Sequence, residues 1–317
     1  MVQKALIAVG GENLIDYVDR EGVATAYPGG SPYNVAMALG RLGANVTYIS
    51  PISHDRWGNL LAETLVNSNV VLSGGRRLEP TTMARVTVTH GIPTYSFERD
   101  GTAERAVTLP SLRAALPANA RAIHTGSLTL TDGPDADAWE GLCAGCFDEG
   151  VLVSLDPNVR VSVISDIAAY RARIRRMLKR AHLLKLSDED LEALFPFLGP
   201  ASAIAELRGA TSARLVVLTK GGDGVSAWLD DSRIDMAAEP IPRLADSVGA
   251  GDTFSAALLA GLAENGGLSP DGLKTLRSDK LRTLLQRAIA AAALNCARAG
   301  CDPPTQAELE AALHRKA

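Results

Sequence analysis

Two glycines and an aspartate precede an apolar segment near the C-terminal end of the chain. Residues 246–254 read Asp-Ser-Val-Gly-Ala-Gly-Asp-Thr-Phe and continue into a stretch rich in alanine and leucine. Gly249 and Gly251 have no Cβ atom, so the backbone can bend tightly and bring its amides against a ligand. Because the N-terminus of a helix is electropositive, this turn would favour an anion such as a phosphate.

Asp252 gives the same turn a second chemical property. A carboxylate repels a phosphate group unless a hydroxyl proton or a metal ion lies between them. A general base that takes a proton from an alcohol during phosphoryl transfer meets this requirement. The alternative is an ordinary junction between a loop and a helix, in which Asp252 only complements the helix dipole.

A second glycine-rich segment occupies residues 29–44 and begins Gly-Gly-Ser-Pro-Tyr-Asn. Ser31 is expected to cap a helix, with Pro32 in its first turn and Gly43 after its last. The paired glycines permit close approach of a small polar ligand, and Asn34 offers a donor and an acceptor to its hydroxyls. A simple helix start is the alternative interpretation.

Short β-rich runs alternate with helical patterns along most of the chain. The strand candidates mostly lack in-out alternation, as expected for parallel strands that are covered on both faces. Strands are expected over 5–9, 45–50, 122–125, 151–155, 182–186 and 215–219, and helices over 33–42, 58–68, 136–147, 166–179, 188–194, 201–208, 253–263, 280–298 and 306–314. This order predicts an α/β fold with a doubly wound, mostly parallel sheet flanked by helices.

Two segments depart from that order and resemble antiparallel strands, with the clearest alternation over residues 83–89. We predict that they form a small β-sheet lid from about residues 12–28 and 81–103. The rest of the chain has no long linker or obvious repeat, so residues 1–317 are expected to form a single domain.

Composition limits the classes of partner. The chain has 317 residues, a net charge of −4 and a pI near 5.8, with no long run of either sign. We therefore expect no nucleic acid and no membrane partner. The first apolar run is too short for a signal sequence or a membrane span, which favours a cytoplasmic protein. Cys143 and Cys146 have the spacing of a metal or redox site, but no second CxxC or CxxH motif follows to complete a tetrahedral site, so we expect the four cysteines to be free thiols.

The two glycine-rich segments together resemble the signatures of the ribokinase-like (PfkB) carbohydrate kinases, in the same order and separation. The resemblance extends over nearly the whole chain. It implies a β lid over a sugar site and phosphorylation of a sugar hydroxyl by ATP with Mg²⁺, and it leaves dependence on a monovalent cation open. By this resemblance, Asp252 would be the base, and the amides of Gly249, Ala250 and Gly251 would form an anion hole.

The resemblance also assigns residues to the sugar. Asp16, at the end of Gly-Glu-Asn-Leu-Ile-Asp, resembles the family acid that binds two sugar hydroxyls, a role that suits a carboxylate with two acceptor oxygens. Gly30 and Asn34 would line the same pocket.

Further residues resemble family elements around the nucleotide. Residues 219–224 read Thr-Lys-Gly-Gly-Asp-Gly, and Thr219, Gly221 and Gly224 would lie beside ATP. A β-turn between two strands is a compatible interpretation of the same loop. Asn295 resembles the residue near adenine.

The family's Asn-x-x-Glu element is replaced here by residues 187–190, which read Ser-Asp-Glu-Asp. Ser187 would lie near the nucleotide, and Asp190 would reach Mg²⁺ through water, since this ion usually keeps several waters. Solvated acids at a plain helix N-terminus are the alternative.

Four segments resemble the fructokinase branch of the family: 11–16, 97–103, 124–128 and the Asp-Pro-Asn-Val-Arg motif at 156–160. Fructose is therefore the expected substrate. Arg99 would reach the sugar from the lid, while Asn158 and Arg160 would lie near the transferred phosphate, where a guanidinium stabilises developing charge. A solvent-facing arginine and an ordinary turn are the alternative interpretations.

Other functions stay open at this point. A 2-keto-3-deoxygluconate kinase shares the Asp-x-Asn-x-Arg motif, but it needs cations for the substrate carboxylate, and Arg99 is the lid candidate. Another sugar or nucleoside kinase of the family is possible, as is an inactive sugar or nucleotide sensor, although a sensor has no need of Asp252. The lid would also permit a homodimer, because a small sheet leaves one face to cover.

Overall fold

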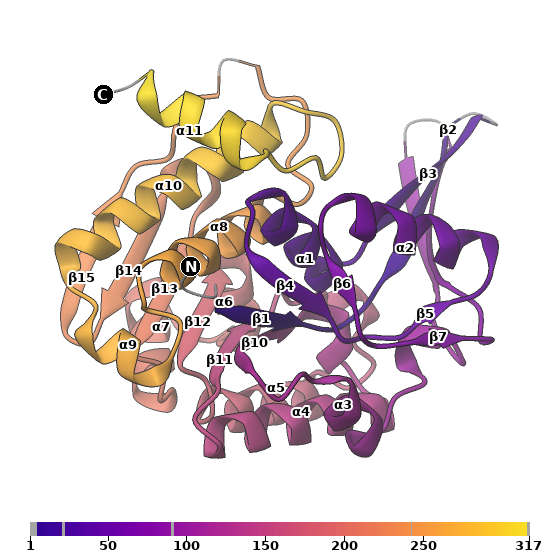
Figure 1. Ribbon diagram of the computed structural model, residues 1–317, viewed down its shortest axis with the longest axis horizontal. Coiled ribbons are helices and arrows are strands. Elements are labelled where there is room, and N and C mark those ends of the chain that lie inside the picture. The colour runs from indigo at the N-terminus through magenta and orange to yellow at the C-terminus, as the bar shows by residue number, and fades with distance from the viewer. Residues whose placement is uncertain (1–4, 21–22, 90–91, 242, 316–317) are drawn as a thin grey trace.

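A nine-stranded sheet lies at the centre of the molecule, in the order β15-β14-β13-β12-β11-β10-β1-β4-β6 (Figure 1). This computed structural model describes residues 5–20, 23–89, 92–241 and 243–315. The parallel strands are β1 (Leu6–Val9), β4 (Asn45–Tyr48), β6 (Val71–Leu72), β10 (Ala120–Gly126), β11 (Leu152–Asp156), β12 (Leu183–Ser187) and β13 (Leu215–Thr219). Next to β13, β14 (Val225–Leu229) and the edge strand β15 (Ser232–Met236) continue the sheet with antiparallel pairing.

Helices cover both faces of this sheet (Figure 1). In β13, Leu215 and Val217 pack into one core, while Val216 and Leu218 pack into the other. The first core contains side chains of α1 (Ser31–Arg41), α2 (Arg56–Asn67), α8 (Ala250–Glu264), α9 (Pro270–Thr275), α10 (Ser278–Cys296) and α11 (Gln306–His314). The second contains those of α3 (Leu109–Ala115), α4 (Gly133–Asp148), α5 (Ile167–Leu178), α6 (Asp188–Leu194) and α7 (Pro200–Ala210). The predicted doubly wound fold is confirmed.

A second sheet of four strands projects from one end of the molecule (Figure 1). It contains, in order, β3 (Val23–Gly29), β2 (Leu14–Arg20), β8 (Thr82–Thr89) and β9 (Ile92–Glu98). Both hairpins are antiparallel as expected, but β2 and β8 pair in parallel, so the two predicted segments join into one mixed sheet. Residues 21, 22, 90 and 91 of the predicted lid lie outside the described residues.

The small sheet contacts the main body through an apolar cluster. Leu14 and Ala84 from the sheet pack with Leu128, and Phe97 and Val163 lie against them. Leu128 and Val163 belong to the short helices η2 (Ser127–Leu130) and η3 (Val161–Val163), which follow β10 and β11. The sheet is therefore held over the ends of these central strands.

Most predicted elements lie within three residues of the observed ones. The sequence patterns did not identify β6, β15, α3 and α9, nor β5 (Ile52–Ser53) and β7 (Arg76–Arg77), which form a separate two-stranded sheet; all of these are short or only partly buried. All four cysteines are free, in agreement with the prediction. No helix of the described ranges has both the length and the apolar character needed to cross a membrane.

Candidate active site

Several predicted site residues lie at the carboxyl ends of the parallel strands of the central sheet. β11 ends at Asp156, β12 at Ser187 and β13 at Thr219. Doubly wound sheets bind ligands in the crevice outside the carboxyl ends of their strands. The geometry of the side chains at these strand ends determines which reaction the protein can catalyse there.

Asp252 joins the two glycine-rich segments directly. The Ser31 hydroxyl donates a hydrogen bond to Asp252 Oδ1 at 2.7 Å, and Asn34 Nδ2 donates to Asp252 Oδ2 at 2.8 Å. Asn34 Oδ1 is buried and has no hydrogen-bond partner among the described residues. Because an unpaired buried acceptor is costly, this oxygen is suited to accept a hydrogen bond from a ligand hydroxyl.

The environment of Asp252 suits a base. Burial raises the pKa of its carboxyl, while the hydrogen bonds from Ser31 and Asn34 and the charges of Lys185 and Arg160 act in the opposite direction. A base is most effective when its pKa is near the working pH, and burial moves an aspartate in that direction. A buried acid that is held by two donors is more than a first-turn complement to the helix dipole.

Ser31 differs from its predicted role as a helix cap. α1 begins at Ser31 itself, its N-cap is Gly30, and no side chain caps it. The backbone of Gly30 has φ of 109°, a conformation that favours glycine. The Ser31 hydroxyl is therefore free to bind Asp252.

The turn before α8 requires its glycine at position 249. Gly249 is the N-cap of the helix and has φ of 74°, and a side chain there would collide with Cys301. The Ala250 amide donates to the Ser247 carbonyl at 3.2 Å. The Ala250 amide of the predicted anion hole is therefore already paired, whereas Gly249 and Gly251 stay predicted. Since the first turn of a helix leaves amides without an internal partner, the Asp252 amide can join that of Gly251 in binding an anion.

Lys185 is a site residue that the sequence analysis missed. It lies on β12, is almost fully buried, and donates to Asp156 Oδ2 at 2.9 Å. A Cβ atom at Gly251 would lie 2.9 Å from Lys185 Nζ, so this ammonium group lies directly under the glycine turn. Burial would lower the pKa of Lys185, but the charges of Asp156, Asp190 and Asp252 raise it. A lysine inside an apolar strand was the available signal.

The predicted sugar-binding acid, Asp16, belongs to lid strand β2. Burial raises the pKa of its carboxyl to about 6, against the charge of Arg160. Gly29, which pairs with Leu14 across the hairpin, leaves room for Asp16, because a side chain at Gly29 would collide with the carboxylate. Arg160 is exposed, and its charge acts on both Asp16 and Asp252. The predicted lid acid and the base therefore share one guanidinium neighbour.

The 156–160 turn is tied to α6 by Asp190. Asp190 Oδ1 accepts from the Val159 amide at 2.6 Å, and Oδ2 accepts from the Ser187 amide at 2.8 Å. Ser187 caps α6 in return, since its hydroxyl accepts from the Asp190 amide. Asn158, within this turn, has φ of 38°, which asparagine tolerates better than most residues.

Arg99 lies among other polar side chains under the lid. Its Nε donates to Glu104 Oε1 at 2.9 Å, and Nη1 donates to the Thr131 hydroxyl at 3.0 Å. The Arg99 side chain is 10% exposed and that of Glu104 is 2% exposed, so the pair is buried. The charge of Arg99 is thus already balanced by a carboxylate of the protein.

A cavity of about 600 Å³ opens beside the glycine turn that precedes α8. Its walls are mostly apolar or glycine, and they include the predicted Thr219, Gly221 and Gly224 together with Ala250 and Gly251. Such a wall suits a flat base and a backbone-bound phosphate chain.

Asn295 does not line this cavity, although Ala292, Ala293 and Cys296 of the same helix do. The Asn295 side chain is fully buried and donates to the Val248 carbonyl at 2.7 Å. It therefore holds the glycine turn in place, which is a different contact from the predicted one near adenine.

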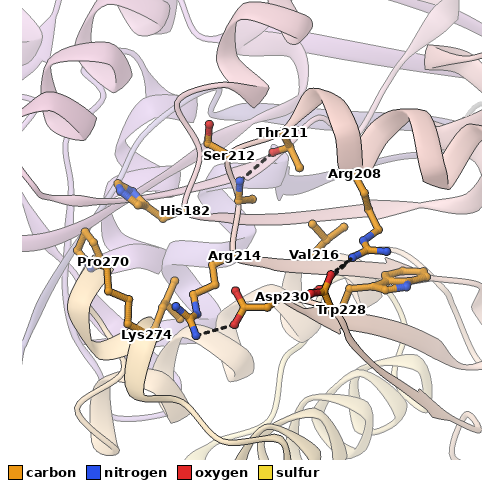
Figure 2. Close-up of a pocket in the computed structure, with 13 residues that line it drawn as sticks. His182, Arg208, Thr211, Ser212, Arg214, Val216, Trp228, Asp230, Pro270 and Lys274 are labelled. Carbon is orange, nitrogen blue, oxygen red and sulfur yellow. Dashed lines mark hydrogen bonds and ion pairs between the residues drawn. The ribbon is translucent and has the colours of Figure 1, made fainter.

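A second cavity, of about 580 Å³, lies at the opposite ends of the same strands. Figure 2 shows Arg208 and Arg214 directed toward Asp230, with His182 and Lys274 nearby. Arg208 Nη2 donates to the Asp230 carbonyl at 2.9 Å, and Arg214 forms an ion pair with the Asp230 carboxylate at 2.5 Å.

Comparison with known proteins agrees with this geometry. A family model described as pfkB family carbohydrate kinase matches residues 6–308. A fructokinase of Rhizobium leguminosarum bv. trifolii is 36% identical over 278 residues, which cover 86% of this chain and 84% of the relative. A fructokinase of Klebsiella pneumoniae is 31% identical over 276 residues, which cover 85% of this chain and 87% of the relative.

Solved structures share the fold. A fructokinase from Xylella fastidiosa with bound ATP has a TM-score of 0.89 and 25% identity, with 99% of each chain covered. A fructokinase from Vibrio cholerae O395, in a form with fructose, ADP and a calcium ion, has a TM-score of 0.84 and 23% identity, with 98% of this chain and 99% of that chain covered. At 23% identity, the second match is evidence for the fold alone.

Proposed function

Because the chain belongs to the pfkB family of carbohydrate kinases, we propose that it transfers the γ-phosphoryl group of ATP to a hydroxyl of fructose. The observation that carries the proposal is the position of Asp252. Its carboxylate is held by Ser31 and Asn34, and Ala250 and Gly251 of the same helix line the cavity of about 600 Å³, which we assign to the nucleotide and call the nucleotide cavity. An acceptor hydroxyl and a phosphate chain would thus meet at one base.

In the proposed reaction, the sugar hydroxyl gives its proton to Asp252 while its oxygen bonds to the γ-phosphorus. The bond from that phosphorus to the β–γ bridging oxygen breaks, and ADP leaves. The amides of Gly251 and Asp252 and the charges of Lys185 and Arg160 favour the negative charge of the transferred group. Asp16, Gly30 and Asn34 would orient the sugar, and Asn158 would lie near the phosphate.

Fructose is favoured over an acid sugar by the state of Arg99. A 2-keto-3-deoxygluconate kinase needs a cation for the substrate carboxylate, but Arg99 is already paired with buried Glu104. A neutral sugar needs no such partner. The relatives reported above are fructokinases, which favours the same substrate.

Magnesium fits this site only as part of the nucleotide complex. Both Asp190 oxygens accept backbone hydrogen bonds, and within the described ranges no three His, Cys, Asp or Glu side chains are grouped to hold a metal. We expect the ATP phosphates and water to carry Mg²⁺, with Asp190 acting at most through water. When bound, the ion would neutralise phosphate charge. A monovalent cation, a cytoplasmic location, the absence of nucleic acid and membrane partners, and a homodimer through the lid stay predictions.

The test is ADP formation from ATP and Mg²⁺ with fructose, ribose, 2-keto-3-deoxygluconate, adenosine or fructose 6-phosphate. We expect fructose to give the highest kcat/KM. Faster turnover of another sugar would keep the reaction and change the substrate. Absence of turnover with every compound would favour an untested substrate or the sensor function.

A further inference from the structure

The Ser31 hydroxyl holds Asp252 beside α1, but no effect of this contact on the reaction has been assigned so far. We propose that Ser31 is a positioning residue for Asp252, which holds the carboxylate in one orientation and favours its ionised form. The proposal rests on the proposed function, because it assumes that Asp252 is the base. It is based on the 2.7 Å hydrogen bond from Ser31 Oγ to Asp252 Oδ1 between two buried side chains.

The position of Ser31 is fixed independently of Asp252. Its amide donates to Glu12 Oε1 at 3.0 Å, and Glu12 Oε2 accepts from the Thr129 hydroxyl at 2.8 Å. Glu12 is 1% exposed, so this support is inside the protein. Since Gly30 occupies the N-cap position of α1, the Ser31 hydroxyl is not needed to cap the helix. The hydroxyl is therefore held in place and directed to the base.

The two donors from α1 act on different oxygens of the base. Ser31 binds Oδ1 and Asn34 binds Oδ2, so together they restrict rotation of the carboxylate. Each carboxylate oxygen has two acceptor positions, which leaves room for a substrate hydroxyl beside either donor. Loss of the Ser31 hydroxyl would leave Oδ1 without its protein donor.

Several charged or titratable groups face Asp252 from neighbouring elements. Lys185 of β12 and Arg160 after β11 favour its ionised form, while interactions with Asp156 of β11 and with Cys301 of the C-terminal loop oppose it if those groups carry negative charge. Burial also opposes ionisation and is the largest cause. The Ser31 hydrogen bond lowers the pKa of Asp252 against burial. Removing it should raise that pKa.

The experiment compares the native protein with Ser31→Ala and Ser31→Thr in two measurements. The first is kcat/KM for the sugar against pH. The second is a ¹³C NMR titration of the Asp252 carboxyl, assigned as the aspartate signal that is absent from Asp252→Asn. In Ser31→Ala we expect both midpoints to rise by about one pH unit, given the strength of a hydrogen bond to a charged group. Ser31→Thr keeps a hydroxyl and should return both toward native values.

The direction of the kinetic effect follows from the role of the base. A higher pKa leaves more Asp252 protonated, so the acidic limb moves to higher pH, and the looser orientation of the carboxylate adds a smaller fall in rate well above both midpoints. Ser269→Ala is the control, because Ser269 caps α9 by accepting from the Gly272 amide and does not touch Asp252. It should leave both midpoints unchanged.

The NMR titration separates failure of this proposal from failure of the proposed function. If no sugar is phosphorylated but the Asp252 signal shifts in Ser31→Ala, the proposed function fails, while the effect of Ser31 on the ionisation of Asp252 stands. If the native protein turns over and Ser31→Ala has unchanged midpoints in both measurements, the role of Ser31 is wrong. An equal fall in rate at every pH with an unchanged titration would also overturn it.

Discussion

The two ends of the central strands differ in how far their charged side chains are buried. At the carboxyl end, Lys185 and Asp156 form an ion pair whose side chains are only 6% and 1% exposed. At the amino end, Arg214 and Asp230 form a pair whose side chains are 32% and 51% exposed. The cavities beside them have similar volumes, about 600 Å³ and about 580 Å³. Volume alone therefore does not identify the functional end.

The difference lies in what each arrangement costs. Charges that leave water pay a large desolvation penalty, whereas exposed ion pairs contribute little in either direction. At the carboxyl end, Asp156, Lys185 and Asp252 are all buried, and Asn34 Oδ1 and Asp156 Oδ1 have no partner among the described residues. At the amino end, Arg208 binds the carbonyl of Asp230 and Arg214 pairs with its carboxylate near the surface, and the buried atom left without a partner among the described residues there is a donor, Arg214 Nε. Buried charge and open acceptors distinguish the end at which we propose that the chemistry occurs.

Among substitutions that test this difference between the two ends, we expect the largest loss of activity at Asp252. Asp252→Asn keeps the shape of the side chain but removes the base, so sugar-dependent ADP formation should fall at least ~10²-fold. Asp231→Asn, at the edge of the amino-end cavity, is the matched control and should retain native turnover. Native turnover in Asp252→Asn, with the folded state verified by circular dichroism, would show that the base is elsewhere.

The next effect is on stability. Lys185→Met removes one partner of a buried pair, and the uncompensated Asp156 charge should lower the free energy of unfolding by about 3–5 kcal/mol. Arg214→Met removes one partner of an exposed pair and should cost about 0–1 kcal/mol. Urea unfolding at neutral pH measures both changes.

A double variant tests the cause of the Lys185 effect. In Lys185→Met with Asp156→Leu, no charge is left unpaired, so part of the lost stability should return. Equal losses in Lys185→Met and Arg214→Met would contradict the difference between the two ends.

How far the sequence predicted this end of the sheet depends on the range of each contact. The glycine turn at 246–254 and the apolar strands are local patterns, and both were predicted. The hydrogen bonds from Ser31 and Asn34 to Asp252 join residues 221 and 218 positions apart, and they depend on α1 packing against α8. Local patterns cannot fix such packing, so Ser31 was predicted as a helix cap.

Lys185 shows the same limit from the other direction. Its neighbours in β12 are apolar, and no local rule gives the partner of a lysine in a buried strand. The partner, Asp156, is the last residue of the adjacent strand β11. β11 and β12 pair directly in the sheet, but a helix separates them along the chain. Buried polar pairs of this kind need the strand order, which the sequence alone did not provide.

Asp16 provides a smaller, pH-dependent effect. Burial raises the pKa of its carboxyl from the usual 3.8 to about 6, so the folded protein holds this proton more tightly than the unfolded chain. The resulting stability is present below about pH 4 and is lost as the pH rises to 6. Relative to Asp16→Asn, the native free energy of unfolding should fall over this window by on the order of 1–2 kcal/mol, after allowance for partial exposure.

Glu308 should change the free energy of unfolding with pH in the opposite direction to Asp16. A hydrogen bond from the Thr305 amide and the pairing with Arg298 lower the pKa of its carboxyl from 4.5 to about 2. Relative to Glu308→Gln, native stability should therefore be lost as the pH falls from 4.5 toward 2. Urea unfolding of the three proteins from pH 2 to 7 would contradict this account if the two differences had the same sign.

The smallest effect is expected at the amino-end cavity, where Lys274→Ala and Arg208→Ala should leave kcat/KM for both substrates unchanged. Val216 lines this cavity and Thr219 lines the other, so along β13 the two are about 10 Å apart. Lys274 pairs with exposed Asp271, and Arg208 bonds a carbonyl at the surface, so each substitution should cost at most about 1 kcal/mol. A change in turnover without a comparable loss of stability would mean that the two ends are coupled through β13, and the separation between a chemical end and a surface end would have to be abandoned.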